Sequence, residues 1–413
     1  MHSIGILGLG YIGLPLALAF SKKNFVYGYD VNSKRVKDLS KGIDFNKEFS
    51  KKEIKKSNKI FFTDDINQLK ECKIYIITVP TPIFKNKKPN LSYLKKSCEL
   101  VAKILKKNDI IIFESTVYPG VTENFCVKII QKNSNLVFNK EFFCGYSPER
   151  INPGDQKNTL ENVVKITSGC NSRIAKKIDD LYKTIIKAGT LKVESIKIAE
   201  AAKVIENSQR DLNIAFVNEL SIIFEKMNLD INKILKAAES KWNFLPFKPG
   251  LVGGHCIGVD PHYLTYISKQ YRYFPKVILS GRSVNDSMSN FFVNKFLKNL
   301  KKRKINILKS NILILGLSFK ENCSDTRNSK VFEIYHKLVN LKSNVHIYDP
   351  VIDNKYIFNK HKIKLVSYPR TRYYDGVIVA VAHSKFSKMG LNKILNFCKK
   401  NYYLYDLKNM FKK

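Results

Sequence analysis

Two widely separated parts of the chain share one pattern of hydrophobic and polar positions. Each begins with a short apolar run that ends in a glycine turn, at residues 3–10 and 311–318, and a stretch with helical apolar spacing follows. A second apolar run then ends in aspartate, at residues 25–30 and 344–349. Strand, turn, helix and strand form a βαβ unit, so the pattern predicts a doubly wound parallel-sheet domain toward each end of the chain.

Further apolar segments complete this picture. Short continuous runs at residues 73–79, 109–114 and 376–381 are typical of parallel strands that are covered on both faces. Residues from about 195 to 225 keep apolar spacings of three and four without Pro or Gly, which predicts one long helix. Residues 242–261 are rich in Gly and Pro but not polar, so we interpret them as an ordered site loop. The expected fold class is α/β, with two doubly wound parallel-sheet domains joined by a central helical domain that carries the long helix.

The composition excludes several classes of protein. Lys and Arg total 72 against 35 acidic residues, a formal charge of +37, which could indicate a nucleic-acid or membrane-surface binder. The basic residues are mostly lysines scattered along the chain, so we interpret the excess as a solvated surface and expect no specific nucleic-acid partner. The eight cysteines form no CxxC pair, which predicts neither a metal site nor a disulfide framework. Without a signal peptide or membrane span, we expect a soluble, cytoplasmic protein with no membrane insertion.

The first glycine turn predicts a dinucleotide site. Its GxGxxG fingerprint consists of Gly8, Leu9, Gly10, Tyr11, Ile12 and Gly13. The first glycine allows the tight turn, the second lets the pyrophosphate approach the backbone, and the third lets the helix pack on the sheet. Asp30 would accept hydrogen bonds from the ribose and repel a 2′-phosphate, which favours NAD over NADP. Arg35 lies nearby and leaves that preference open.

Two loops that follow strands belong to the same expected site. They are residues 78–82, Thr-Val-Pro-Thr-Pro, and residues 114–120, Glu-Ser-Thr-Val-Tyr-Pro-Gly. Ligands of such folds bind beyond the carboxyl ends of the strands, so these loops should line the nicotinamide side. The cofactor-binding residues that we take from them are Thr78, Pro80, Thr81, Ser115 and Thr116.

Two pairs of residues predict chemistry between the domains. Lys203 and Asn207 stand one turn apart on one face of the predicted long helix, although such a pair could also simply face solvent. Cys256 and Asp260 share the glycine-rich loop. A cysteine is most often structural, but one beside an acid, a histidine and exposed backbone donors suits a nucleophile. The C-terminal glycine turn lacks the later glycines of the fingerprint, which indicates a different nucleotide, such as the UDP of a substrate.

Taken in order along the chain, the motifs resemble the UDP-glucose/GDP-mannose (nucleotide-sugar) dehydrogenase family, nearly end to end. The segments that carry the resemblance are residues 8–13, 78–82, 114–116, 147–154, 203 with 207, 253–261, 319–322 and 325–327. Residues 147–155 and 241–247 are most similar to the branch that acts on UDP-N-acetylhexosamines in bacterial surface-polysaccharide pathways of the Vi-antigen type. UDP-GlcNAc and UDP-GalNAc are not distinguished, and UDP-N-acetylmannosamine and UDP-glucose stay as alternative substrates.

The resemblance implies three domains and their ligands. Residues 1–192 would form an NAD-binding Rossmann domain, residues 193–303 a central helical domain with the dimer contact and the cysteine loop, and residues 304–413 a Rossmann-like domain that binds UDP. It implies NAD as the cofactor, a UDP-N-acetylhexosamine as the substrate, a homodimer and no metal. The expected reaction is oxidation of the sugar C6 alcohol to a carboxylate.

The resemblance also implies roles for the reactive residues. Cys256 would add to the C6 aldehyde and give a thiohemiacetal, which is oxidised to a thioester and hydrolysed, so that two NADH form per sugar. Lys203 and Asn207 would stabilise the developing negative charge on oxygen. Asp260 and Thr116 would position a water that takes the hydroxyl proton.

Hydrolysis and substrate binding draw on a further set of residues. Glu149 would activate the water that hydrolyses the thioester. The implied substrate-binding residues are Glu149, Arg150, Ile151, Lys203, Asn207, Lys248, Gly253, His255, Phe319 and Lys320. Arg327 is assigned to the cofactor-binding set, although Asp325 and Arg327 could form only a surface ion pair. Lys248 stands where relatives commonly carry Arg, and lysine keeps the charge but loses the bidentate fork.

Two other readings of the sequence stay open. A β-hydroxyacid or 6-phosphogluconate-type dehydrogenase would share the NAD domain and a helix-borne Lys and Asn, but it would produce one NADH and need no thiol. A basic nucleotide- or nucleic-acid-binding protein rests on the net charge alone, since no compact basic motif is present.

Overall fold

The computed structural model describes residues 3–46, 48–151, 158–254 and 256–411 of the 413-residue chain. The chain divides into two compact units. The first unit contains residues 1–206 and 262–274, and the second contains residues 207–261 and 275–413. Within the described ranges, none of the helices combines the length and the apolar character needed to cross a membrane.

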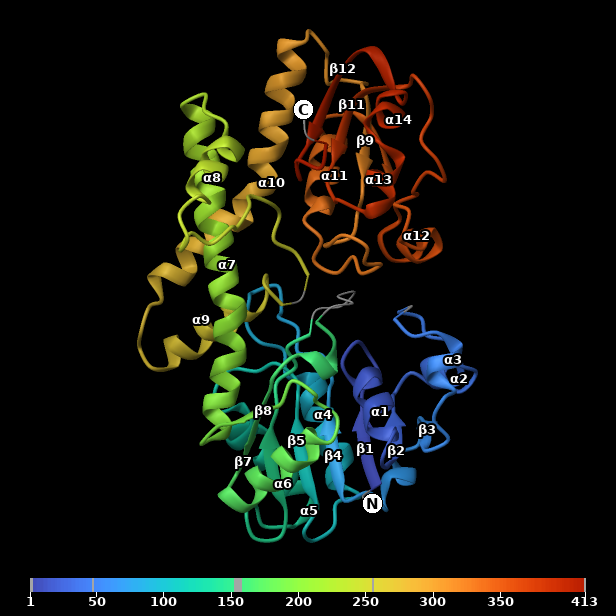
Figure 1. Cartoon of the computed structure of the whole chain (residues 1–413), viewed down its shortest axis with the longest axis vertical. Coiled ribbons are helices and arrows are strands. Elements are labelled where there is room, and N and C mark those ends of the chain that lie inside the picture. The colour runs from blue at the N-terminus through green and yellow to red at the C-terminus, as the bar shows by residue number, and fades with distance from the viewer. Residues whose placement is uncertain (1–2, 47, 152–157, 255, 412–413) are drawn as a thin grey trace. The chain divides into compact units, whose positions relative to one another are not determined.

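The first unit is built on one eight-stranded sheet (Figure 1). Its strands are β1 (Ser3–Leu7), β2 (Phe25–Tyr29), β3 (Ile60–Thr63), β4 (Ile74–Ile77), β5 (Ile110–Phe113), β6 (Phe143–Tyr146), β7 (Lys165–Gly169) and β8 (Thr190–Lys192). They lie in the order β3-β2-β1-β4-β5-β6-β7-β8. All neighbours are parallel except β6 and β7, which pair antiparallel. The strands predicted at residues 3–10, 25–30, 73–79 and 109–114 are confirmed.

Helices cover both faces of this sheet. They are α1 (Gly13–Ser21), α2 (Ser33–Ser40), α3 (Lys51–Ile54), α4 (Ser92–Ala102), α5 (Val127–Ser134) and α6 (Ser172–Lys183). Because successive strand side chains point to opposite faces, neighbouring residues enter two separate cores. Ile76 packs in the core with α1 and α6, whereas Ile77 packs in the core with α4 and α5. This two-sided burial explains why the strands read as continuous apolar runs.

The second unit contains a four-stranded, all-parallel sheet in the order β10-β9-β11-β12. Its strands are β9 (Asn311–Leu315), β10 (Asn344–Tyr348), β11 (Tyr374–Val379) and β12 (Cys398–Asp406). Its helices are α8 (Ile231–Ala238), α10 (Lys276–Lys302), α11 (Val331–Asn340), α12 (Asn354–His361), α13 (Ser384–Met389) and α14 (Leu391–Leu395). The second doubly wound sheet and the strands predicted at residues 311–318, 344–349 and 376–381 are therefore confirmed.

Two helices belong in part to each unit. Helix α7 (Ile196–Lys226) is 31 residues long and confirms the long helix predicted from about residue 195 to 225. Helix α9 (Asp260–Gln270) begins in the second unit and continues in the first. Residues 243–254 form no regular element, yet Gly250, Val252 and Gly254 are buried, which fits an ordered loop. The domain boundaries after residues 192 and 303 stay a prediction.

Candidate functional site

The first glycine turn has no room for a side chain at Gly13 but has open space at Gly10. Gly8 has a φ of +97° and its N–H donates to the Tyr29 carbonyl oxygen at 2.8 Å. A Cβ on Gly13 would lie 1.7 Å from the Gly8 carbonyl oxygen, whereas a Cβ on Gly10 would meet nothing within 4 Å. The turn leads directly into α1, whose first N–H groups face outward from the helix end. The residues present therefore fit a pyrophosphate that approaches the backbone at Gly10.

Asp30 and Arg35 brace this turn from the adjacent strand and helix. Asp30 accepts hydrogen bonds from the backbone N–H groups of Leu9 and Asn32, both at 2.9 Å. Arg35 donates from Nε to the Leu9 carbonyl oxygen at 3.0 Å and pairs through Nη1 with Asp44 at 2.8 Å. Its buried Nη2 has no hydrogen-bond partner among the described residues. Arg35 is thus held beside the turn by Asp44, with one donor unsatisfied.

The loops after β4 and β5 are tied to each other and to the glycine turn. Thr78 donates from Oγ1 to the Gly8 carbonyl oxygen at 2.7 Å. Thr81 donates to the Thr116 carbonyl oxygen at 2.5 Å, and Ser115 donates to the Val79 carbonyl oxygen at 2.6 Å. Pro80, from the same predicted set, is exposed. The carboxyl ends of β1, β4 and β5 therefore converge at one edge, as parallel strands require.

A buried ionic cluster lies at the same edge of the sheet. Glu114 follows β5, Glu149 follows β6, and the ammonium Nζ of Lys165 lies 2.7 Å from Glu114 Oε2 and 3.2 Å from Glu149 Oε2. Tyr182 of α6 donates its hydroxyl to the other oxygen of Glu114. All four residues are buried. A cluster of two carboxylates, one ammonium and one phenol is unusual in a protein core, where charges are normally paired one to one.

The two carboxyl groups of this cluster differ in acidity. Burial raises the pKa of Glu114 to about 7, against the attraction of Lys165. Burial also opposes ionisation of Glu149, but Lys165 and two backbone donors outweigh it and hold the pKa of Glu149 below its ordinary value. These donors are the N–H groups of Arg150 and Ile151, at 2.6 and 2.8 Å from Oε1. Glu149 is thus the ionised carboxylate of the pair.

Helix α7 is anchored to the first unit by a second buried acid. Glu200 accepts hydrogen bonds from the backbone N–H groups of Gly120 at 2.5 Å and Thr122 at 2.9 Å. Burial raises its pKa to about 7. Lys203 follows one turn later on α7 and is 8% exposed, so it is not a solvent-facing lysine. The guanidinium of Arg150 pairs with Glu206 on the same helix at 2.7 Å.

In the second unit, the cysteine loop ends at a buried acid–amide pair. The side chain of Asn207 donates from Nδ2 to Asp260 Oδ2 at 2.5 Å, and both residues are buried. The Cys256 carbonyl oxygen accepts the Asp260 N–H at 2.8 Å, which makes the turn that opens α9. Cys256 itself is exposed. His255, which the sequence assigned to the substrate, lies outside the described residues.

The start of the cysteine loop is pressed against the segment after β9. A Cβ on Gly253 would lie 2.8 Å from the Asn328 carbonyl oxygen, and one on Gly254 would lie 2.8 Å from the Phe319 ring. Gly254 also has a φ of +79°, and its carbonyl oxygen accepts a hydrogen bond from Asn328 Nδ2 at 3.1 Å. Gly253 and Phe319 are thus brought together, and both line a hollow with Lys320.

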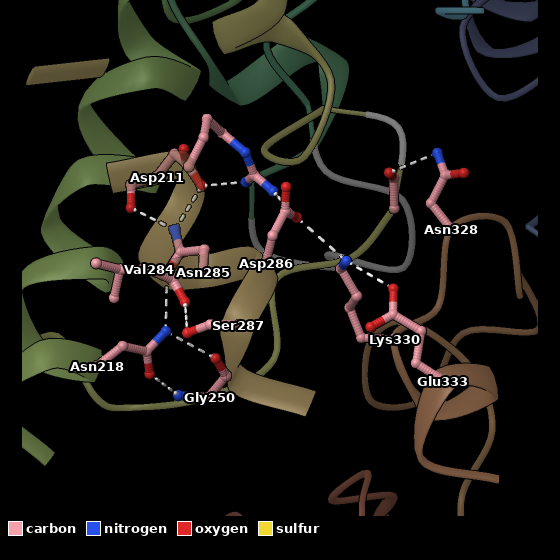
Figure 2. A network of polar contacts seen from close by, with 12 residues as sticks. Asp211, Asn218, Gly250, Val284, Asn285, Asp286, Ser287, Asn328, Lys330 and Glu333 are labelled. Carbon is pink, nitrogen blue, oxygen red and sulfur yellow. Dashed lines mark hydrogen bonds and ion pairs between the residues drawn. The ribbon is translucent and has the colours of Figure 1, made fainter. Parts of the chain in front are cut away.

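A polar network holds the backbone at Gly250, ahead of Cys256 (Figure 2). The Asn218 amide of α7 pairs with both backbone groups of Gly250, at 2.8 and 3.0 Å, and donates to Asn285 Oδ1 at 2.8 Å. Asn285 donates in turn to Asp211, which also accepts from Arg282 at 2.7 Å. Figure 2 shows Asn285 and Asn218 facing each other, with Gly250 beside Asn218. Residues of α7 and α10 therefore fix the backbone six residues before Cys256.

The turn after β9 repeats the construction of the first turn. Asp349 at the end of β10 accepts the Leu317 N–H at 2.7 Å, as Asp30 accepts that of Leu9. A buried histidine, His383, contacts Asp349 through Nε2 at 3.1 Å. This turn lacks the open glycine of the first one, because Ser318 there is fully buried. The turns after β1 and β9 therefore differ at this position, which is open at Gly10 and closed at Ser318.

The other predicted residues of the second unit lie at the surface. Lys248 is exposed. Arg327 forms a bidentate ion pair with Asp325, with Nη2 and Oδ2 2.6 Å apart. Among the described residues, no group of three or more His, Cys, Asp or Glu side chains is arranged to hold a metal ion.

Sequence reasoning missed several residues that the structure places beside the expected site. Lys165, Tyr182, Asn218 and Asn285 were not singled out. The available signal was a lysine directly after two valines, in the segment Val163-Val-Lys-Ile166, and asparagines within helices that are otherwise amphipathic. Their partners lie 16 to 74 positions away along the chain, so the pairings could not be read from local spacing.

The chain matches one family over most of its length. Residues 2–186 match the NAD binding domain of the UDP-glucose/GDP-mannose dehydrogenase family, residues 197–287 its central domain, and residues 313–413 its UDP binding domain. A UDP-N-acetyl-D-glucosamine 6-dehydrogenase of Salmonella typhi is 51% identical over 98% of this chain and 95% of the relative. One of Pseudomonas aeruginosa is 49% identical over 98% of this chain and 96% of the relative.

A solved structure agrees over the whole chain. That of a UDP-D-ManNAc dehydrogenase from Pyrococcus horikoshii has a TM-score of 0.90 and 28% identity, and it covers 100% of this chain and 96% of that chain. The ranges matched by the family models include the glycine turn, residues 250–260 and the turn after β9. The chain belongs to the UDP-glucose/GDP-mannose dehydrogenase family and is an NAD-dependent oxidoreductase.

Proposed function

We propose that this enzyme oxidises the C6 hydroxyl of a UDP-N-acetylhexosamine, UDP-GlcNAc or UDP-GalNAc, to the uronic acid for surface-polysaccharide synthesis. The observation that carries the proposal is the exposed Cys256 in a loop whose backbone is fixed on both sides, by Asn218 at Gly250 and by the Asn207–Asp260 pair. An exposed thiol beside an acid, in a loop that is held at both ends, suits a covalent catalyst. The near 50% identity to two UDP-N-acetyl-D-glucosamine 6-dehydrogenases supports the acetamido sugar.

We place the cofactor at the first glycine turn and the loops predicted to lie beside it. We assign NAD to Gly8, Gly10, Tyr11, Ile12, Gly13, Asp30, Arg35, Thr78, Pro80, Thr81, Ser115, Thr116 and Arg327. NAD, when bound, supplies the acceptor for the two electrons of each oxidation step. Support comes from the open backbone at Gly10 and from the unsatisfied donor of Arg35 beside it.

Cys256 carries the covalent chemistry in this proposal. Its thiolate adds to the C6 aldehyde, and the resulting thiohemiacetal is oxidised to a thioester. The ammonium of Lys203 and the amide of Asn207 stabilise negative charge on the C6 oxygen, because a nearly buried cation and donor act strongly where water is excluded. Asp260 and Thr116 hold the water that takes up the proton of the C6 hydroxyl.

Glu149 completes the reaction as the base that activates water against the thioester. Its lowered pKa supports this role, since a base must be ionised before it accepts a proton. We assign substrate binding to Glu149, Arg150, Ile151, Lys203, Asn207, Lys248, Gly253, His255, Phe319 and Lys320. Lys408 joins this set as a candidate, because its ammonium lies 3.3 Å from the Cβ position of Gly250.

We further propose a homodimer that acts in the cytoplasm. Four apolar residues of α7 are exposed, namely Ile198, Ile205, Phe216 and Ile223. Their spacings of seven, eleven and seven residues keep them on one face of the helix. Such a stripe favours burial against a second copy, which light scattering of the purified protein would detect. No disulfide joins the described cysteines, which is consistent with a reducing compartment.

A panel of UDP-sugars incubated with NAD tests the proposed function. We expect two NADH per sugar and a uronic acid product from UDP-GlcNAc or UDP-GalNAc, and weaker turnover of UDP-N-acetylmannosamine and UDP-glucose. One NADH per substrate would favour a β-hydroxyacid-type dehydrogenase instead. No NADH from any UDP-sugar, together with nucleic-acid binding that survives physiological salt, would favour the basic binding protein.

A further inference from the structure

The buried ionic cluster of Glu114, Glu149, Lys165 and Tyr182 owes its position to one reversed strand. Strands β5 and β6 end where Glu114 and Glu149 follow them. Strand β7 runs antiparallel to β6, with Tyr146 opposite Ser168 and Gly145 opposite Gly169. Its first residue, Lys165, therefore lies at the edge where β5 and β6 end. A parallel β7 would have put the same residue at the opposite edge of the sheet.

Lys165 is the cation that serves both carboxylates of this cluster. Its ammonium lies 2.7 Å from Glu114 and 3.2 Å from Glu149, and its own side chain is 3% exposed. Tyr182 contributes a hydroxyl from α6 and no charge. The neighbouring guanidinium of Arg150 points elsewhere, because it pairs with Glu206 and donates to the Val164 carbonyl oxygen. The charge state of Glu149 therefore depends on the ammonium group of Lys165, which also contacts Glu114.

We propose that Lys165 is a positioning residue that keeps the Glu149 carboxylate ionised and aimed for thioester hydrolysis, with Glu114 as a second carboxylate that shares its ammonium. This inference rests on the proposed function of Glu149 and goes beyond it. In the step concerned, the water oxygen bonds to the thioester carbon, the C–S bond breaks and Cys256 leaves as thiolate. Glu149 takes the proton of the water and later releases it to solvent.

The physical reason is the cost of a buried charge. A carboxylate that is removed from water and lacks a counter-ion takes up a proton, and a protonated Glu149 could not act as the base. Lys165 prevents this, and the backbone N–H groups of Arg150 and Ile151 fix the direction of one Oε. Because two carboxylates share one ammonium, the cluster binds its last proton more tightly than a simple ion pair would. The pKa of Glu114, raised by burial to about 7, fits that arrangement.

The pH dependence of kcat tests the proposal with two variants that remove different members of the cluster. Lys165→Met removes the counter-ion, so the acid limb of kcat should move to higher pH. Glu114→Gln puts a neutral amide where Glu114 already carries its proton below about pH 7, so the acid limb should stay close to that of the wild type. Lys165→Arg keeps the charge and should return the limb toward that of the wild type. A general loss of packing in Lys165→Met would lower kcat without moving the limb, and that outcome would overturn the proposal.

A matched lysine provides the control. Lys183, whose side chain is exposed, pairs with the buried Asp179 at 2.6 Å on α6, beside the same strand. Lys183→Met removes a lysine ion pair from this layer, and we expect kcat and its pH profile to stay as in the wild type. If Lys165→Met does not fold, Lys165→Gln replaces it, since it also removes the charge, and an unmoved acid limb in that variant overturns the proposal.

A rapid-quench experiment identifies the affected step. In Lys165→Met we expect the first turnover to release two NADH per active site at a rate within about threefold of the wild type, while steady-state kcat falls at least tenfold. The thioester should then accumulate on Cys256 and be visible by mass spectrometry of the quenched protein. Loss of the NADH burst, or a slow variant without the adduct, would overturn the inference. A wild type that produces no NADH from UDP-sugars would instead overturn the proposed function.

Discussion

Asn207 on α7 donates its side-chain N–H to the carboxylate of Asp260 at 2.5 Å, although the two residues stand 53 positions apart. Asp260 is the first residue of α9, and its own N–H closes the turn onto Cys256. This buried contact joins the long helix to the end of the loop that carries the thiol. The chemistry assigned to Cys256 therefore depends on a pairing between α7 and α9.

Breaking this contact should slow catalysis. Asn207→Leu leaves the buried Asp260 without its amide donor, and a hydrogen bond to a charged group contributes about 1.5–3 kcal/mol. We expect kcat to fall roughly 10- to 100-fold, which steady-state NADH production would measure. Glu219→Gln, at an exposed position of the same helix, is the control and should leave kcat unchanged. Wild-type kcat in Asn207→Leu would show that the contact is dispensable.

Replacing the thiol should separate the two oxidations. Cys256→Ser should reduce uronic acid formation on the order of a thousandfold or more, because a hydroxyl at neutral pH is a far weaker nucleophile than a thiolate. No covalent adduct should be seen by mass spectrometry, and any NADH formed should not exceed one per sugar. Cys170→Ser, at a half-buried cysteine of the first unit, serves as the control. Uronic acid release at the wild-type rate by Cys256→Ser would contradict the covalent mechanism.

Two glycines of the first turn should fail in different ways. The methyl group that Gly10→Ala adds would have no atom within 4 Å, so we expect an unchanged melting temperature. NAD binding should weaken about tenfold or more, because this methyl group occupies the side that the pyrophosphate approaches. Gly13→Ala would put its methyl 1.7 Å from the Gly8 carbonyl oxygen and should destabilise the fold by about 1–3 kcal/mol. Thermal unfolding and NAD titration distinguish the two. Equal NAD affinity in Gly10→Ala and the wild type would refute the proposed cofactor position.

Glu200 should make stability depend on pH. Its pKa is raised by burial from 4.5 to about 7, so the folded state holds a proton that the unfolded state releases at lower pH. The free energy of unfolding should therefore be greatest below about pH 4.5 for this group and fall by roughly 3 kcal/mol as pH rises to 7, at 1.36 kcal/mol per unit.

Glu200→Gln isolates this contribution. The variant carries no titrating group at this position, so its melting temperature should vary less steeply than that of the wild type between pH 4.5 and 7. Glu194→Gln, close by in sequence just before α7, is the comparison and should keep the wild-type slope. Parallel curves for the wild type and Glu200→Gln would mean that this carboxyl does not titrate in that range.

Local pattern was sufficient for the fold class. Continuous apolar runs predicted β1, β4, β5 and β9, because strands covered on both faces need apolar side chains at every position. The three-and-four spacing predicted α7 to within one residue at each end. The first glycine turn was also predictable, because the contacts that hold it join residues within about twenty positions of each other, such as Leu9 and Asp30.

The ionic cluster and the support of the cysteine loop were decided only by the tertiary structure. The sequence gives no sign that β7 reverses direction, and that reversal alone brings Lys165 to Glu114 and Glu149. Likewise, Asn218 pairs with Gly250 across 32 residues. The physical reason is the same in both cases. Periodicity and turn chemistry are local, whereas the partner of a buried charge or amide is set by which distant backbone the core packs beside it.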